Sequence, residues 1–311
     1  MTERLPAYGG QALIEGVLMR GSRALAAAMR KPDGEIVIVT EELQGLYQSK
    51  LTRIPFLRGL LLLWDALGLG TRYLTISANQ QTGEDEKLEG PQLYLTLAIS
   101  MAAGIGLFFV LPVALGQGVE KLSGMGPWWV NLIEGLLRLV IAIAYIWAIG
   151  KMPEVARVFS YHGAEHKTIN AFEAHEDLTP ATIAKYSLEH PRCGTSFLLS
   201  VMLISIIFFL ALGPLPPLTR YLSRILLLPV IVMLAYEYMR WTANHLSYAW
   251  VRWLIRPNLA LQGLTTREPD LDMLEVSLAA FNAMLELEQK LTGVTVSSNE
   301  ILRSQEQSQP A

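Results

Sequence analysis

The sequence predicts a mainly α-helical membrane protein that crosses the bilayer about four times, with a small β-rich segment before the spans and an amphipathic helix after them. Of its 311 residues, 51% are hydrophobic and only 17% are charged, whereas about 25% charged residues is usual for soluble proteins. Several apolar stretches reach the roughly 20 residues that cross the hydrocarbon core of a bilayer. Cys193 is the single cysteine, which excludes an internal disulfide framework and suits a reducing compartment.

Four stretches are candidate spans. Residues 90–118 and 193–219 contain no charged residue, and residues 127–150 are interrupted only by Glu134 and Arg138. The fourth begins near Tyr221 and ends near Arg240, after a tight turn predicted by the prolines and glycine of residues 213–217. Residues 58–78 are too polar to span alone and are expected to form an interfacial or partly buried helix. If they did cross, the count would be five.

The distribution of basic residues orients these spans. With four spans, the N-terminal segment, the central loop and the C-terminal segment share one side, and together they hold 21 of the 25 Lys and Arg residues. Because positively charged loops stay in the cytoplasm, we expect a multi-pass protein of the cell (inner or plasma) membrane with both ends and the central loop cytoplasmic. The lipid bilayer is its expected partner, and the net charge of −3 gives no reason to expect nucleic acid. The first eight residues do not resemble a cleavable signal peptide.

Five segments are expected along the chain. Residues 1–56 are a cytoplasmic β-rich segment, in which strand-like runs flank a turn at residues 31–34. Residues 57–90 hold the interfacial helix and an acidic linker, and residues 91–240 form the four-helix bundle with a cytoplasmic loop at 151–196. Residues 241–292 are an interfacial segment and a docking helix, and residues 293–311 a disordered tail. The docking helix has apolar residues at helical spacing, namely Leu271, Leu274, Leu278, Phe281, Met284 and Leu285.

The central loop contains an H-x-x-E-H motif at residues 162–166. On a helix from Pro153 to about Glu173, His162 and His166 lie one turn apart on the same face and can reach one divalent metal. Glu165 lies close by and could take a proton from water activated by the metal. Glu173 falls near the same stripe, so two imidazoles and a carboxylate would leave the open position of a hydrolytic zinc site. The competing interpretation is that both histidines are ordinary polar residues at a membrane surface.

Other polar segments have two interpretations each. His190 or Cys193, just before the third span, could supply a further ligand, or the segment could be a turn with Cys193 as a small buried side chain. The glycine-rich residues 8–21 could bind substrate or phosphate, but their spacing does not fit a phosphate loop, and a strand and turn is at least as compatible. Glu134 and Arg138 are either an intrahelical ion pair or the lining of a cavity.

Together, four segments resemble the YqhQ-like family of uncharacterised bacterial membrane proteins. They are residues 9–17, residues 161–167, residues 190–195 and residues 264–269. The family is described only as proposed metal-dependent enzymes of unknown activity. The resemblance therefore directs the metal hypothesis onto His162, Glu165, His166, Glu173, His190 and Cys193. The motif is also similar to that of inverted zinc peptidases, but those are soluble proteins of another architecture, and their reaction is not carried over.

Three functions are compatible with these patterns. The first is a metal-dependent membrane hydrolase at the cytoplasmic face, with zinc as the expected ion, Glu165 as the general base and an unidentified substrate. The second is a non-catalytic scaffold or assembly factor with a structural metal or histidine cluster, which a closed four-ligand site including Cys193 would favour. The third is a transporter with Glu134, Arg138 and Glu237 along a path, for which no internal repeat is visible.

Overall fold

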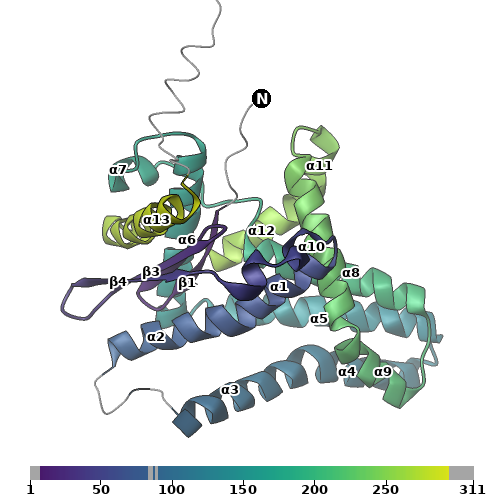
Figure 1. Ribbon diagram of the computed structural model, residues 1–311. Coiled ribbons are helices and arrows are strands. Elements are labelled where there is room, and N and C mark those ends of the chain that lie inside the picture. The colour runs from purple at the N-terminus through teal and green to yellow at the C-terminus, as the bar shows by residue number, and fades with distance from the viewer. Residues whose placement is uncertain (1–7, 83–86, 88–89, 294–311) are drawn as a thin grey trace, which may run out of the picture.

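A four-stranded sheet near the N-terminus and a set of long helices make up the protein (Figure 1). The computed structural model describes residues 8–82, 87 and 90–293. The predicted disordered tail and most of the predicted acidic linker lie outside these residues.

The sheet is an antiparallel meander of β1 (Gly9–Leu13), β2 (Gly16–Arg20), β3 (Ala24–Arg30) and β4 (Ile36–Glu42). The strands β3 and β4 confirm the predicted hairpin, and Gly34 adopts a φ of 91° in its turn. The glycine-rich run forms β1 and β2, so the strand-and-turn interpretation of this segment is confirmed.

Both faces of the sheet are covered by helices. Along β3 the side chains alternate, so Ala24, Ala26 and Ala28 pack into one hydrophobic cluster and the intervening residues pack into another. The alanine face contacts α6 (Pro153–Glu173) and α13 (Leu271–Thr292), and the opposite face contacts α2 (Thr71–Gln81). In Figure 1, α13 and α2 accordingly lie on opposite sides of the strands. The short alanine side chains allow the helices to approach the sheet closely.

The predicted docking helix is α13, and it docks on the sheet. Asp270 caps its first turn by accepting a hydrogen bond from the Met273 amide at 2.8 Å. Of the predicted apolar face, Leu274, Phe281 and Met284 are fully buried, whereas Leu271 is 57% exposed, so its predicted burial was wrong. Leu271 begins the helix, beyond the edge of the surface that the sheet covers.

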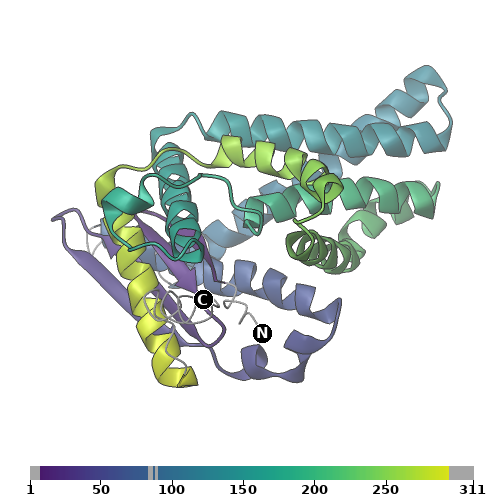
Figure 2. The ribbon, with the colours of Figure 1, turned by 90° about the horizontal axis from the view of Figure 1, so that it is seen from above.

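Three helical stretches are long and apolar enough to cross a membrane, by length and composition alone. They are α3 (Gly90–Ile105) continued through the π-helical η5 (Gly106–Val110) into α4 (Leu111–Ser123), then α5 (Pro127–Ile149) and α8 (Gly194–Leu212). A fourth is possible if α9 (Pro217–Leu226) and α10 (Leu228–Asn244), which meet at a 44° bend, count as one span. The described chain therefore has three or four candidate spans, and Figure 2 shows them extending away from the sheet.

The remaining helices connect the sheet to the candidate spans. The helix α1 (Leu57–Asp65) continues through η3 (Ala66–Gly70) into α2, packs against α10, and is not among the candidate spans. Short helices occupy the loops: η1 (Gly45–Gln48), η2 (Lys50–Arg53), α7 (Pro180–Ile183) and α11 (Ala249–Leu254). The helix α12 (Arg256–Thr265) packs on α8 and returns the chain to α6, where the candidate site lies.

Candidate metal centre

The helix α6 presents the two motif histidines on one face. It begins at Pro153, whose ring suits the first turn of a helix, and continues without interruption to Glu173. His162 and His166 are one turn apart, and their ring centroids are 4.4 Å from each other. The helix thus places two imidazoles side by side, as the spacing predicted.

Cys193 joins these histidines from a different element. It is the N-cap residue of α8, and its Sγ lies 3.1 Å from Nε2 of His162. Ligand atoms of His162, His166 and Cys193 all lie within 4.8 Å of one another. Zinc–nitrogen and zinc–sulfur bonds of about 2.0 and 2.3 Å at a tetrahedral angle separate N and S by roughly 3.5 Å, which is close to the observed distance. We call these three residues the histidine–cysteine group.

Backbone carbonyls orient both imidazoles. The carbonyl oxygen of Thr265 lies 2.8 Å from Nδ1 of His162, and that of Leu188 lies 2.5 Å from Nδ1 of His166. Because a carbonyl can only accept, each Nδ1 carries a proton, and in the neutral ring each Nε2 then has a lone pair. Nε2 of His166 is buried and has no hydrogen-bond partner among the described residues. This is the arrangement in which a histidine can bind a cation.

Glu165 is a buried carboxylate next to the group. It accepts a hydrogen bond from the backbone amide of Gly10, while its Oε2 is buried without a partner in the part of the chain that the structure describes. Burial raises the pKa of Glu165 above its ordinary value of 4.5. A carboxyl group with a raised pKa is a stronger proton acceptor than an ordinary one, as a general base requires.

Gly10 fits against Glu165 because it lacks a side chain. A Cβ at this position would lie 2.5 Å from the carbonyl oxygen of Leu18 and 3.0 Å from the Glu165 side chain. The glycine of β1 therefore lets the sheet approach the carboxylate closely enough for its amide to donate.

His190 and Glu173 lie beside the group rather than in it. The His190 ring is buried, its centroid is 5.7 Å from that of His166, and burial lowers its pKa below the ordinary 6.5, which favours the neutral ring. Its Nε2 is 3.8 Å from Glu173, too far for a hydrogen bond, and Glu173 forms an ion pair with Arg192. Glu173 follows His166 by two helical turns, about 10 Å along the axis. Glu173 lies on the same face of α6 as the two histidines but too far along the helix axis to bind one ion together with both of them.

Several residues that hold the site were not predicted as functional. Gln262 of α12 brackets His190, because its side chain accepts from the His190 amide at 2.9 Å and donates to the His190 carbonyl at 2.8 Å. Gly163 allows the chain after α12 to cross α6, since a Cβ there would lie 2.2 Å from the carbonyl oxygen of Arg267. The sequence offered one signal that could have identified such residues as functional. The four family-like segments contain Gly10, Gly163 and Thr265.

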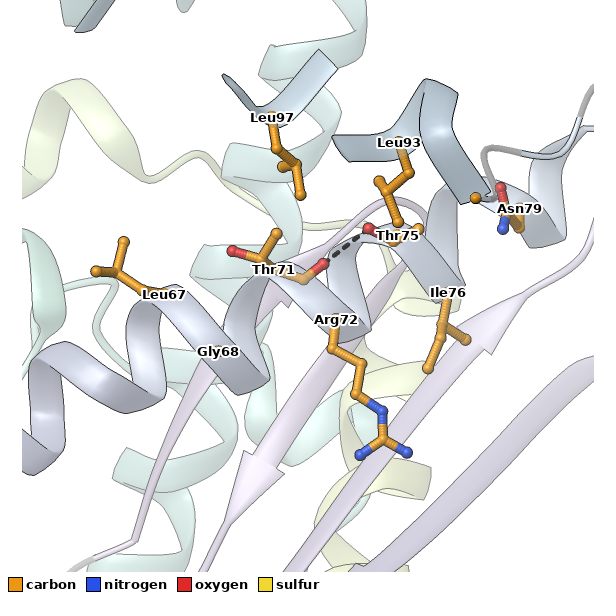
Figure 3. A pocket seen from close by; sticks show the side chains of 10 residues that line it. Leu67, Gly68, Thr71, Arg72, Thr75, Ile76, Asn79, Leu93 and Leu97 are labelled. Atoms are coloured by element: carbon orange, nitrogen blue, oxygen red, sulfur yellow. Dashed lines mark hydrogen bonds between the residues drawn. The ribbon is translucent and has the colours of Figure 1, made fainter. Parts of the chain in front are cut away.

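Two surface hollows lie outside the histidine–cysteine group. One, of 140 Å³, is lined by residues at the end of α5 and the end of α12, including Gly150 and Thr266. The other, of 480 Å³, lies between α2 and α3, with Leu67, Thr71, Leu93 and Leu97 on its walls (Figure 3). Neither is lined by a member of the group. Within the group, His162 is partly exposed, whereas His166 and Cys193 are buried.

Comparison with known proteins places the chain among uncharacterised proteins. Residues 54–287 match the family model described as "Protein of unknown function (DUF1385)". The chain is 33% identical over 300 residues to "Uncharacterized protein YqhQ" of Bacillus subtilis (strain 168), which covers 91% of this chain and 93% of that protein. No solved structure matches. The four segments meet along α6, and this arrangement and the overall similarity lead to one conclusion: the chain belongs to the DUF1385, or YqhQ-like, family of proteins of unknown function.

Proposed function

We propose that the protein is a metal-dependent membrane enzyme, a hydrolase whose site lies at the cytoplasmic surface of the cell membrane. One observation carries the proposal. Three ligand atoms of types that bind zinc lie within 4.8 Å of one another, and a buried carboxylate with one unpartnered oxygen lies beside them. Ordinary surface histidines would instead have water or side-chain partners for Nε2.

The donor set fits a divalent ion, with zinc as the expected one. His162 and His166 would bind through Nε2 and Cys193 through Sγ, while the carbonyls of Thr265 and Leu188 keep both rings in the binding tautomer. His190 has a buried Nε2 without a partner among the described residues and is a further candidate. Three protein ligands would leave a fourth position open, as in hydrolytic zinc sites.

Glu165 is the residue proposed to move the proton. A bound ion would supply Lewis-acid activation of a carbonyl, a phosphoryl group or water. The free Oε2 of Glu165 accepts a proton there, and the amide of Gly10 holds the carboxylate in place. The enclosed surroundings, with Cys193 and His166 both buried, keep bulk water away from the carboxylate.

The proposed location depends on the spans. With α9 and α10 counted as one, four spans put α6, the sheet and α13 on the same side, which carries most basic residues of the chain. The substrate would then reach the site from the cytoplasm or from the inner leaflet.

Glu165→Gln tests the catalytic assignment. The variant keeps the size of the side chain, so it should bind as much metal as the parent, measured by elemental analysis. Hydrolysis of a panel of chromogenic carboxylic, peptide and phosphate esters should fall by about 100-fold or more, because the base is lost. Glu154→Gln, an exposed carboxylate in the first turn of the same helix, is the matched control. A Glu165→Gln variant as active as the parent would remove the assignment.

A structural metal site is the second candidate, and the presence of Cys193 favours it. The group joins α6 to the start of α8, and a closed site with a thiolate is typical of structural zinc. Chelation distinguishes the two candidates. Removal of an ion from a structural site should unfold the protein, whereas removal from a catalytic site should abolish hydrolysis and leave most of the fold.

A further inference from the structure

A second cluster of buried polar residues lies among the candidate spans. Glu134 of α5 is 1% exposed and receives two guanidinium groups. Arg138, one turn further along α5, donates to it at 2.9 Å, and Arg224 of α9 donates through Nε and Nη2 at 2.6 and 3.1 Å. Arg138 also donates at 3.0 Å to the carbonyl of Phe108, which lies in the π-helical segment η5.

A further ion pair lies next to it, between α4 and α9. Arg220 precedes Arg224 by one turn, is 4% exposed, and pairs with Glu120 at 3.2 Å. The next residue, Tyr221, donates to the side-chain amide oxygen Oε1 of Gln117 at 3.4 Å. We call Arg138, Arg220 and Arg224, with Glu120 and Glu134, the arginine cluster.

The arginine cluster has more positive charge than its carboxylates balance. Three guanidinium groups face two carboxylates, which leaves one positive charge. Two buried donors also have no partner among the described residues: Nε of Arg220 and Nε2 of Gln117. Both lie where α4 contacts α9, because Gln117 and Glu120 are one turn apart on α4. An uncompensated buried charge is costly, and unpartnered donors next to it are complementary to an anion.

The outer face of α9 indicates where such an anion would come from. Leu218, Leu222 and Leu226 are 72%, 47% and 70% exposed, whereas the arginines of this helix are buried on the other face. In Figure 1, α9 lies at the end of the helices away from the sheet. A helix with this distribution would rest on lipid chains at the membrane surface and direct its arginines toward the bundle.

We propose that the contact between α4 and α9 binds the phosphate group of an anionic phospholipid, at the side of the membrane opposite the histidine–cysteine group. Guanidinium groups bind phosphate through two parallel hydrogen bonds. The phosphate accepts from Arg220 and Gln117 and supplies the missing negative charge, while the acyl chains lie along the leucines of α9. This proposal does not depend on the metal or on the proposed hydrolysis.

The test measures bound lipid on the purified full chain by native mass spectrometry. The protein is exchanged into micelles containing phosphatidylglycerol or phosphatidylcholine, and separate samples receive inorganic phosphate alone. We expect phosphatidylglycerol to remain bound and phosphatidylcholine to be lost. If inorganic phosphate binds as strongly as phosphatidylglycerol, the phosphate site is supported, but the lipid is contradicted as the source of the phosphate.

Two variants, Arg220→Gln and Gln117→Glu, locate the site, and Lys121→Gln is their control. Arg220→Gln should lower phosphatidylglycerol occupancy about tenfold or more, the size expected for a charge-assisted hydrogen bond. Lys121→Gln removes an exposed cation at the same end of α4 and should change occupancy less than about twofold.

Gln117→Glu is the variant that separates binding from folding. It adds the missing negative charge within the protein, so it should abolish lipid binding and raise the melting temperature measured without lipid. If phosphatidylglycerol is bound no better than phosphatidylcholine, or if Arg220→Gln and Gln117→Glu bind it as the parent does, the proposal is overturned.

Discussion

The histidine–cysteine group and the arginine cluster are both buried and polar, but the hydrogen-bond partners missing from them are of opposite kinds. Beside the histidine–cysteine group the unpartnered atoms of the described residues include two acceptors, Nε2 of His166 and one oxygen of Glu165. Nε of Arg192 and the hydroxyl of Tyr8, near the C-terminal end of α6, are unpartnered donors outside the group. Between α4 and α9 they are donors, from Arg220 and Gln117. Lone pairs without donors are complementary to a cation, and N–H groups without acceptors to an anion. The comparison shows that the charge of a missing ligand can be inferred from whether the unpartnered protein atoms are donors or acceptors.

The largest expected effect concerns the arginine cluster. Glu134→Gln removes the carboxylate that neutralises Arg138 and Arg224 at once, so it should destabilise the protein by about 3 kcal/mol. Thermal unfolding in detergent measures this loss. Metal content should not change, because Glu134 makes no contact with the histidine–cysteine group.

Glu120→Gln sharpens this result as its matched control. The Glu120 side chain is 36% exposed, so its loss should cost about 1 kcal/mol or less. If Glu134→Gln and Glu120→Gln lower the stability equally, the burial of Glu134 does not account for its contribution to stability.

The next effect concerns the histidine–cysteine group. Gly163→Ala places a Cβ 2.2 Å from the carbonyl oxygen of Arg267, so the chain after α12 must move and carry the Thr265 carbonyl away from His162. We expect a loss of about 2 kcal/mol or more of stability and a clear fall in metal content, measured by thermal unfolding and elemental analysis.

Gly263→Ala is the control for a glycine in a helix with open space around it. It should be neutral or stabilise by up to about 1 kcal/mol. A Gly163→Ala protein with the stability and metal content of the parent would show that the close crossing at α6 does not position His162.

A smaller effect is expected where β1 and β2 are attached to α6. Glu15, in the turn between these strands, binds Arg157 through two hydrogen bonds of 2.5 Å, and these bonds lower its pKa below the ordinary 4.5. A carboxylate with a lowered pKa stabilises the fold above pH 4.5, and the contribution is lost as the pH falls below that value. Because Arg157 is 54% exposed, Glu15→Gln should cost only about 1 kcal/mol at pH 7.

The pH dependence of unfolding checks the sign of this effect. The difference in melting temperature between parent and Glu15→Gln should be present at pH 7 and shrink in acid below pH 4.5. A difference that grows in acid would contradict the assignment to Glu15.

Much of the fold could be predicted because its patterns are local. Strand-like runs on either side of a turn predicted β3 and β4, helical spacing predicted α13, and the i, i+4 spacing predicted that His162 and His166 share a face. Glu173 shows the limit of such reasoning. The angle around the helix axis placed it on the same face as the histidines, but the rise along the axis separates it from them. The carbonyls of Thr265 and Leu188 could not be predicted, because their directions depend on how distant segments cross α6.

The arginine cluster was only partly predictable. The sequence identified Glu134 and Arg138 as a pair, but Arg220 and Arg224 were expected near a loop. The turn occupies only residues 213–216, and α9 begins directly after it, which brings both arginines onto one buried face. The length of a turn at a proline-rich sequence depends on the helices that pack around it, and this information is not local.

The central claim is that the acceptors around α6 hold a divalent cation, and elemental analysis of the purified protein tests it most directly. The parent should contain about one divalent ion per chain, the double variant His162→Ala, His166→Ala should contain almost none, and His245→Ala, a histidine outside the group, should match the parent. A parent protein free of metal, or a double variant that keeps its ion, would contradict the account.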